Sequence, residues 1–326
     1  MTHWAVYGAV AFALSWTVQH LIIRLSQASG LLIDDADKPQ KLHRRSIPRA
    51  GGIGLFAGAL LLWSFPVGKA AVLCMIPALL SGLIEDFYQK LSPAVRLLMQ
   101  SAAALAAILY ADATVRYLGL GIHLPYWMGV GFSLIAIAGF MNAMNLIDGL
   151  NGLAAGIGML ILTSFAVTAW RVGDEAMVAY TLIVGGATAG FLLHNFPRAR
   201  IFLGDGGAYL LGFLIALPGI YLAGHHEDVS PWYIFAVLIY PVWEVFFSVY
   251  RRKRAGRSAT EADAAHLHTL LYRRLGSNPG ATIRLLLGYA PYLAIATLIA
   301  HHSIGCILLS LGFVFVYTIL YRRLSA

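Results

Sequence analysis

The chain has 326 residues, of which 59% are apolar and 12% are charged, and its formal net charge is +8. A soluble domain carries about 25% charged residues, so this composition excludes an ordinary soluble protein and also a disordered chain. The only two cysteines, Cys74 and Cys306, lie in apolar runs, which excludes a disulfide scaffold.

Eleven apolar blocks follow one another along the chain. A membrane-spanning helix needs about 20 apolar residues, or about 17 when flanking residues reach the interface. Three of the blocks are short, and we expect their neighbours to complete them. The first block has no basic segment before it and no small-residue cleavage site after it, so we interpret it as a helix and not as a signal peptide. The sequence thus predicts an all-α polytopic membrane protein of about eleven transmembrane helices, over residues 4–23, 50–68, 70–84, 97–111, 124–141, 152–170, 176–193, 201–222, 231–250, 285–300 and 303–321.

Basic residues are sorted between alternate loops. If the first helix runs from outside to inside, 20 of the 23 Lys and Arg residues lie in inner loops, and only Lys69, Arg116 and Arg171 lie in outer ones. This positive-inside distribution predicts an outside N-terminus and a cytoplasmic C-terminus. Because the basic residues stand in separate loops beside the membrane, a nucleic-acid partner is disfavoured.

The polar residues suited to chemistry gather in the inner loops. The sequence shows no internal repeat and no soluble domain, so residues 1–326 are predicted to form one integral-membrane catalytic domain in the inner (plasma) membrane. Its active face would be cytoplasmic and built from loops 24–49, 85–96, 142–151, 194–205 and 251–284.

The first inner loop contains a K-x-H pattern followed by PR-x-GG. Lys41 and His43 are two residues apart, which suits an extended loop, and Arg49 precedes Gly51 and Gly52. Glycines permit the close approach of backbone or of a phosphate. A solvated basic loop with a Gly-Gly helix-packing patch explains the same residues equally well.

Two adjacent carboxylates, Glu85 and Asp86, end an apolar block of only 15 residues. At 1.5 Å per residue this block covers about 22 Å of a ~30 Å hydrocarbon core, so the pair should lie at or just below the membrane surface. Adjacent acids at that depth repel each other and need a cation or a set of donors. We favour a catalytic role; the alternative is a pair of interfacial caps with Lys90 as partner.

The stretch 142–153 is rich in polar residues although it joins two apolar blocks. Steps of three along a helix place the first three polar residues on one side of a turn, and the two glycines permit close approach or a helix break. Helix capping would explain one or two of these residues but not all four. The polar residues are Asn142, Asn145, Asp148 and Asn151, and the glycines are Gly149 and Gly152.

The last two clusters are a lone carboxylate and a basic loop. Asp205 stands between glycines at the start of an apolar block, where it can cap a helix or bind Mg²⁺ together with substrate phosphates. In the longest inner loop, Arg251 and Arg254 can clamp a diphosphate, and His266 and His268 can donate to phosphate oxygens. The alternatives are a topology signal for the arginines and simple exposure for the histidines.

Taken together, the clusters resemble the polyprenyl-phosphate N-acetylhexosamine-1-phosphate transferase family, in its bacterial UDP-GlcNAc:undecaprenyl-phosphate branch (glycosyltransferase family 4). The resemblance runs from about Asp34 to Arg274 with the motifs in family order, and N-x-x-N-x-x-DG-x-x-GL is the most specific match. Three positions depart: Glu85 replaces the usual Asp, Ala208 the usual Ser, and Thr269 the third histidine of the loop motif.

The resemblance implies transfer of a sugar-1-phosphate from a UDP-sugar to polyprenyl phosphate, with UMP as the second product, to initiate cell-envelope glycans such as lipopolysaccharide O-antigen. It implies Mg²⁺, with Mn²⁺ as a substitute, held by Asp205 and Asn145. The implied partners are the two substrates and the lipid bilayer, with a homodimer as an option. The implied catalytic residues are Asp86, Glu85, Asp148, His266 and His268, and the implied substrate-binding residues are Lys41, His43, Arg49, Lys90, Asn142, Asn145, Asn151, Arg251 and Arg254.

Two rival classes also fit a polytopic chain. A secondary transporter or lipid flippase would place ionisable residues near the bilayer midplane and show repeats; here only Glu244 lies near the middle of an apolar block. A CDP-alcohol phosphotransferase would carry a D-G-x-x-A-R run with two further aspartates, which this chain lacks.

Overall fold

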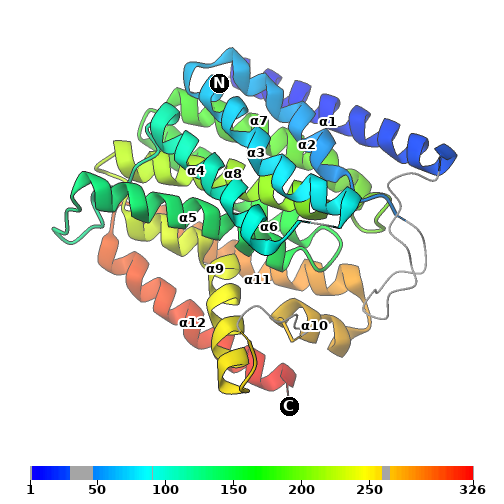
Figure 1. Ribbon diagram of the computed structural model, residues 1–326. Helices are drawn as coiled ribbons and strands as arrows, with labels where there is room; N and C mark the ends of the chain where they lie inside the picture. The colour runs from blue at the N-terminus through cyan, green and yellow to red at the C-terminus, as the bar shows by residue number, and fades with distance from the viewer. Residues whose placement is uncertain (1, 30–46, 90, 259–264, 326) are drawn as a thin grey trace.

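The structure is a computed structural model that describes residues 2–29, 47–89, 91–258 and 265–325 (Figure 1). Within these ranges every element is helical, apart from two isolated β-bridges. The helices are α1 (Thr2–Ser29), α2 (Gly51–Ala59), the 3₁₀ helix η1 (Leu60–Ser64), α3 (Pro66–Tyr88), α4 (Pro93–Ala111), α5 (Tyr126–Ile147), α6 (Leu153–Arg171), α7 (Glu175–Asn195), α8 (Gly204–His225), α9 (Pro231–Arg254), α10 (Leu267–Leu275), α11 (Asn278–Leu298) and α12 (Ser303–Ser325).

Ten of the described helices are long and apolar enough to cross a bilayer, one fewer than the eleven expected. The all-α polytopic class is confirmed, and the difference in number lies in the block 50–68. There α2 ends at Ala59 and tightens into η1, Phe65 is extended, and Pro66 already begins α3. Proline cannot donate a hydrogen bond to a preceding helix and is favoured in the first turn of a new one, so the block is divided at that point.

The short segment formed by α2 and η1 nevertheless runs back along α1. At its start, the side-chain amide of Gln19 donates to the carbonyl of Gly51 at 2.7 Å. At its end, the ring of Phe65 packs against the rings of Trp4 and Tyr7, close to the beginning of α1. The segment therefore returns the chain toward the end of the bundle at which α1 begins.

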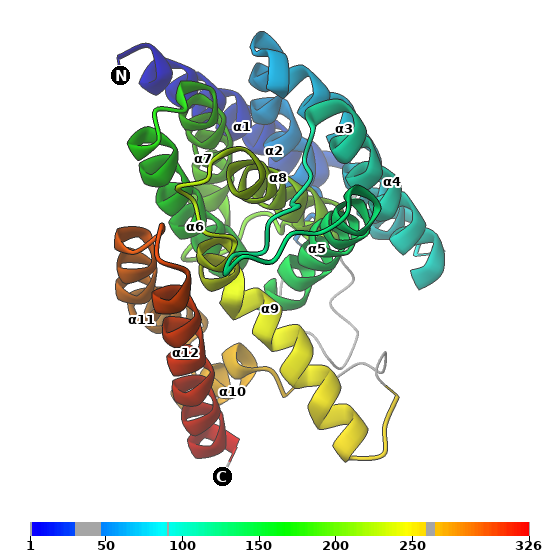
Figure 2. The ribbon, with the colours of Figure 1, turned by 90° about the vertical axis from the view of Figure 1, so that its left-hand side faces the viewer.

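Helix α8 is the central element of the bundle, with α3, α5, α6 and α7 packed around it (Figure 2). Its side chains from Leu210 to Leu217 are almost completely buried. Two glycines let α3 and α8 touch backbone to backbone: a β-carbon at Gly206 would lie 2.7 Å from the amide nitrogen of Leu83, and one at Gly82 would overlap the peptide bond after Asp205. This contact brings the last turn of α3 against the first turn of α8.

Candidate active site

The carboxylate of Asp86, in the last turn of α3, caps the first turn of α8. The backbone N–H of Asp205 donates to Asp86 Oδ1 at 3.0 Å, and the N–H of Gly206 donates to Oδ2 at 2.9 Å. A helix N-terminus leaves such donors unpaired and favours negative charge. Gly204 fits here because a β-carbon would lie 2.6 Å from Asp86 Oδ2. The alternative that Asp205 caps its own helix is wrong, since Asp86 does so.

The side chain of Asp205 is therefore available to other partners. Arg96, in the first turn of α4, donates to Asp205 Oδ2 at 3.0 Å, and the amide of Asn145 donates to Oδ1 at 3.1 Å. Both ion-pair partners are about three-quarters buried, with side-chain exposures of 22% for Arg96 and 29% for Asp205. In the sequence, Arg96 is one of the 20 basic residues of the inner loops and was not expected in the site. Nothing in its local sequence identifies its partner, which lies 109 residues away.

Asp148 lies in the same electrostatic neighbourhood. It follows the last residue of α5, and its backbone N–H donates to the carbonyl of Asn145 at 3.2 Å. The pKa of Asp148 is raised to about 7, mainly by burial and also by the nearby carboxylates of Asp205 and Asp86, while Arg49 acts in the opposite direction. Three carboxylates from α3, the α5–α6 turn and α8 thus repel one another at one end of the bundle.

The two loop histidines stack against each other and reach the α5–α6 turn. The rings of His266 and His268 are 5.5 Å apart and nearly parallel. A β-carbon at Gly149 would collide with Nε2 of His268, so the absence of a side chain at Gly149 admits the imidazole. Burial lowers the pKa of His268 to about 4. His268 is therefore a neutral imidazole at pH 7.

Glu244 on α9 holds these histidines in place. Its carboxylate accepts the N–H of Leu267 at 3.0 Å and lies 3.2 Å from Nδ1 of His266. Glu244 is fully buried, and this pairing explains how an acid can stand near the middle of an apolar block. The sequence marked Glu244 as an exception but did not connect it with the histidine loop.

Other predicted residues lie near the cluster and support it structurally. Glu85 accepts the backbone N–H of Leu91 at 2.9 Å. The amide of Asn142 donates to the side-chain oxygen of Gln100 and to the carbonyl of Ala138.

Asn151 ties the α5–α6 turn to two other parts of the chain. Its backbone N–H donates to the side-chain oxygen of Asn278 at 2.9 Å, and its carbonyl accepts the hydroxyl of Thr282 at 2.9 Å. Its side-chain amide donates to the carbonyl of Pro197 at 3.2 Å. These bonds fix the turn that carries Asp148 against α11.

The PR-x-GG stretch packs against the segment that leads into α8. Arg49 and Phe202 form a parallel bridge, and the N–H groups of Gly51 and Gly52 donate to the carbonyls of Phe202 and Leu203. A β-carbon at Gly52 would lie 2.7 Å from the amide nitrogen of Gly207. The helix-packing interpretation of the glycines is thus confirmed, and this packing brings Arg49 to the carboxylates.

Two predicted arginines lie elsewhere. Arg251 and Arg254 face a groove between the C-terminal ends of α9 and α12, and not the carboxylate cluster. The predicted substrate-binding residues Lys41, His43 and Lys90 lie outside the described residues.

The donor set fits a magnesium ion. Among the described residues, no group of three or more His, Cys, Asp or Glu side chains is placed to hold a metal. Mg²⁺, however, is often bound by one or two protein carboxylates, with waters and substrate phosphates completing its shell. Asp86, Asp148 and Asp205 repel one another, and a bound divalent cation would offset their negative charge. Asp205 would hold such an ion, together with Asn145, whose side chain contacts it.

Comparison with known proteins shows which family the chain is similar to. A model described as glycosyl transferase family 4 matches residues 69–223, which include Asp86, Asp148 and Asp205. A probable undecaprenyl-phosphate N-acetylglucosaminyl 1-phosphate transferase of Bacillus subtilis is 30% identical over 79% of this chain and 75% of its own length.

Two further relatives carry similar names. The decaprenyl-phosphate N-acetylglucosaminephosphotransferase of Mycobacterium tuberculosis is 31% identical over 71% of this chain and 67% of its own. The undecaprenyl-phosphate alpha-N-acetylglucosaminyl 1-phosphate transferase of Thermotoga maritima is 31% identical over 74% of each chain. The resemblance drawn from the motifs is confirmed: the chain belongs to glycosyl transferase family 4.

Proposed function

We propose that the protein transfers an N-acetylhexosamine-1-phosphate from a UDP-sugar to a polyprenyl phosphate, giving polyprenyl-diphosphate-sugar and UMP. The names of the relatives support the acceptor class and the transferred group. We place the reaction at the cytoplasmic face of the plasma membrane, because the distribution of basic residues puts the five motif-bearing loops on that side.

In this reaction an oxygen of the lipid phosphate attacks the phosphorus atom that carries the sugar. The bond from that phosphorus to the bridging oxygen breaks, and UMP leaves with its electron pair. A phosphate monoester has a second pKa of about 6, so the acceptor is largely dianionic at pH 7 and needs little help from a base. Asp86, held by two backbone donors, is our candidate to orient this nucleophile or to take its residual proton.

Both substrates are anionic, so a site that binds them together needs positive charge to offset their repulsion. Arg96 pairs with Asp205, and the charge of Arg49 acts on Asp86 and Asp148. Neutral His268 offers one N–H to a phosphate oxygen. Asp205, with Asn145, would hold Mg²⁺. When bound, Mg²⁺ supplies neutralisation of the diphosphate and of the charge that develops during transfer.

One observation carries the proposal: three carboxylates and two arginines from five separate segments converge at one end of the bundle. A transporter or flippase would instead need its ionisable residues near the bilayer midplane. The one mid-block acid, Glu244, is paired with the histidine loop, which removes the observation that favoured that rival.

The substrate test uses purified protein in detergent with a panel of UDP-N-acetylhexosamines and undecaprenyl phosphate. We expect UMP release with at least one sugar, dependent on Mg²⁺ and partly restored by Mn²⁺. Lipid movement across vesicles without UMP release would instead favour a flippase.

The metal test compares two aspartates. We expect Asp205→Ala to lose at least about a hundredfold in rate, because it removes a group that positions charge in the transition state, and added metal should not restore it. Asp112→Ala is the matched control, since Asp112 has an 81% exposed side chain at the opposite end of α4. Near wild-type turnover of Asp205→Ala would exclude Asp205 as a metal ligand.

A further inference from the structure

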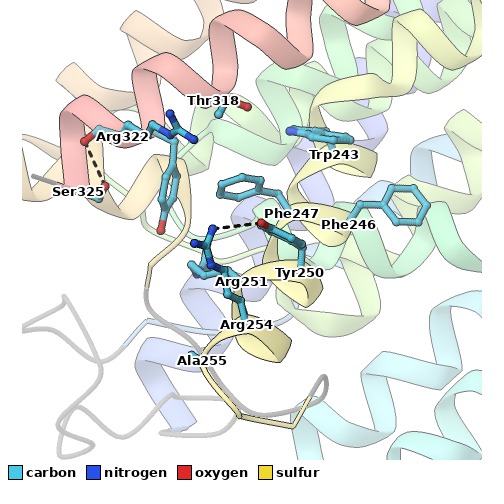
Figure 3. A pocket seen from close by; sticks show the side chains of 11 residues that line it. Trp243, Phe246, Phe247, Tyr250, Arg251, Arg254, Ala255, Thr318, Arg322 and Ser325 are labelled. Carbon is cyan, nitrogen blue, oxygen red and sulfur yellow. Dashed lines mark hydrogen bonds between the residues drawn. The ribbon is translucent and has the colours of Figure 1, made fainter.

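A groove with a volume of about 710 Å³ lies between the C-terminal ends of α9 and α12 (Figure 3). One wall is an aromatic stripe on α9 that contains Trp243, Phe247 and Tyr250, at the spacing of one helix face. The other wall is the last two turns of α12, including Thr318 and Tyr321. The two helices meet where the ring of Phe247 packs edge-on against that of Tyr321 at 4.7 Å.

Three arginines converge on this groove: Arg251 and Arg254 from α9, and Arg322 from α12. The guanidinium of Arg251 lies 5.5 Å from the centre of the Tyr321 ring, and Arg254 donates to the hydroxyl of Tyr250 at 3.3 Å. No acidic side chain is among the described residues that line the groove. The charged side chains among these described lining residues are therefore all basic, which favours an anionic ligand.

A helix C-terminus favours basic residues in any protein, so basic ends alone would indicate no ligand. Two features go beyond that explanation. The neighbouring basic residues Lys253 and Arg323 are exposed and do not line the groove. The three arginines are therefore distinguished from other basic residues at the same helix ends by facing the groove. The walls between them are apolar and open: Phe246 is 60% exposed and Tyr250 is 56% exposed.

The groove is separate from the carboxylate cluster. The described residues that line it belong to α9, the position after α9, and α12, whereas the carboxylates belong to α3, the α5–α6 turn and α8. On α9, the buried Glu244 is bonded to the histidine loop and does not line the groove. A phosphate held by these three arginines would not be presented to Asp86 or Asp205.

We propose that this groove binds an anionic phospholipid of the surrounding membrane. Its phosphate would lie among Arg251, Arg254 and Arg322, and its acyl chains would follow the aromatic stripe into the bilayer. A basic pocket between membrane-spanning helices is a recognised setting for anionic headgroups, and arginine binds phosphate with two parallel hydrogen bonds. A soluble anion would gain nothing from the exposed apolar walls.

The test is lipid retention, measured by native mass spectrometry of delipidated protein in detergent titrated with phosphatidylglycerol or cardiolipin. Arg322→Gln should weaken binding about fivefold, the effect of one basic residue near a charged headgroup. Arg323→Gln is the matched control, with the same charge change one residue away, and it should bind as the wild type does. Thr318→Trp should abolish binding, because its larger side chain fills the groove while every arginine is kept.

A second measurement guards against misfolded variants: bound lipid should raise the thermal unfolding midpoint of the wild type and Arg323→Gln, but not of Thr318→Trp. Equal lipid retention by the wild type, Arg322→Gln and Thr318→Trp would overturn the proposal. Displacement of the phospholipid by one equivalent of undecaprenyl phosphate would assign the groove to that acceptor instead. A dimer that Thr318→Trp dissociates would assign it to a second copy of the chain.

Discussion

At the residue scale, the adjacent acids Glu85 and Asp86 have different surroundings. Successive residues on a helix point about 100° apart, so the two carboxylates face different partners. Asp86 accepts two N–H groups of α8, whereas Glu85 accepts the N–H of Leu91 in the loop that follows α3. The family usually has Asp at position 85, and a contact with a surface loop tolerates the longer arm of Glu.

We therefore expect Asp86→Asn to lose at least about a hundredfold in transfer rate, the lower end for a positioned acid–base group. We expect Glu85→Asp to remain within about tenfold of the wild type. Steady-state rates with UDP-sugar and polyprenyl phosphate measure both, and thermal unfolding shows whether loss of the α8 cap destabilises Asp86→Asn. An inactive Glu85→Asp beside an active Asp86→Asn would reverse the two roles.

The raised pKa of Asp148 predicts that the protein loses stability when this residue ionises. An ordinary salt-bridged aspartate has the opposite effect, because its ionisation adds stability. Its pKa is about 7 in the folded protein, above about 3.9 in an unfolded chain. The folded state thus binds the proton more tightly, so ionisation of Asp148 costs stability as pH rises from about 4 through 7. In metal-free protein without substrate, the unfolding midpoint of Asp148→Asn should exceed that of the wild type increasingly from pH 5 to pH 8. A difference that is constant with pH would contradict the assignment.

The sequence did not identify Arg96, and it assigned Arg251 and Arg254 to the site although they line another groove. It did identify the three carboxylates that the structure brings together, Asp86, Asp148 and Asp205, because polar residues are scarce in this chain and recur at helix ends. It could not predict their pairing. Asp86 meets α8 across 119 residues, and Arg96 meets Asp205 across 109 residues. These contacts depend on how closely α3 and α8 pack, which is set by Gly82 and Gly206. A single sequence records that glycines are present, but not which helix they face.

At the scale of elements, the α5–α6 turn and the histidine loop are fitted to each other. Gly149→Ala should push His268 away from the turn, because the added carbon collides with its imidazole. A displacement of about 1 Å can cost on the order of a hundredfold in catalysis, so we expect at least a tenfold loss of rate. Gly139→Ala in α5 is the matched control, since its β-carbon would meet no atom within 4 Å. Equal rates for both variants would show that the loop does not need this contact.

Element prediction succeeded where apolar length was decisive and failed where a helix changes type. The short blocks 70–84, 97–111 and 285–300 are completed by their neighbours, as α3, α4 and α11 show. The block 50–68 was expected to form one full helix, but its sequence does not reveal the change from α2 to η1. Pro66 marks where α3 begins, but a proline at this position does not by itself tell whether the preceding segment forms a full membrane-spanning helix.

At the scale of the whole molecule, the proposed function requires a defined orientation in the membrane. From the sorting of basic residues we expect the N-terminus outside and the C-terminus in the cytoplasm. Tags at each end, probed in intact cells with an impermeant reagent, measure this directly. The N-terminal tag should react and the C-terminal tag should not. The reverse pattern would move the whole active face to the other side of the membrane.

In the proposed reaction, the carboxylate cluster transfers a sugar together with its phosphate. The most direct measurement supplies purified protein with undecaprenyl phosphate and a reactive UDP-sugar labelled with ³²P in either the α or the β phosphate. We expect β label to enter the lipid fraction while α label remains in UMP. With Asp205→Ala, both labels should stay in the UDP-sugar. Transfer of sugar without β label, or β label appearing only in UDP or free phosphate, would contradict the proposed reaction.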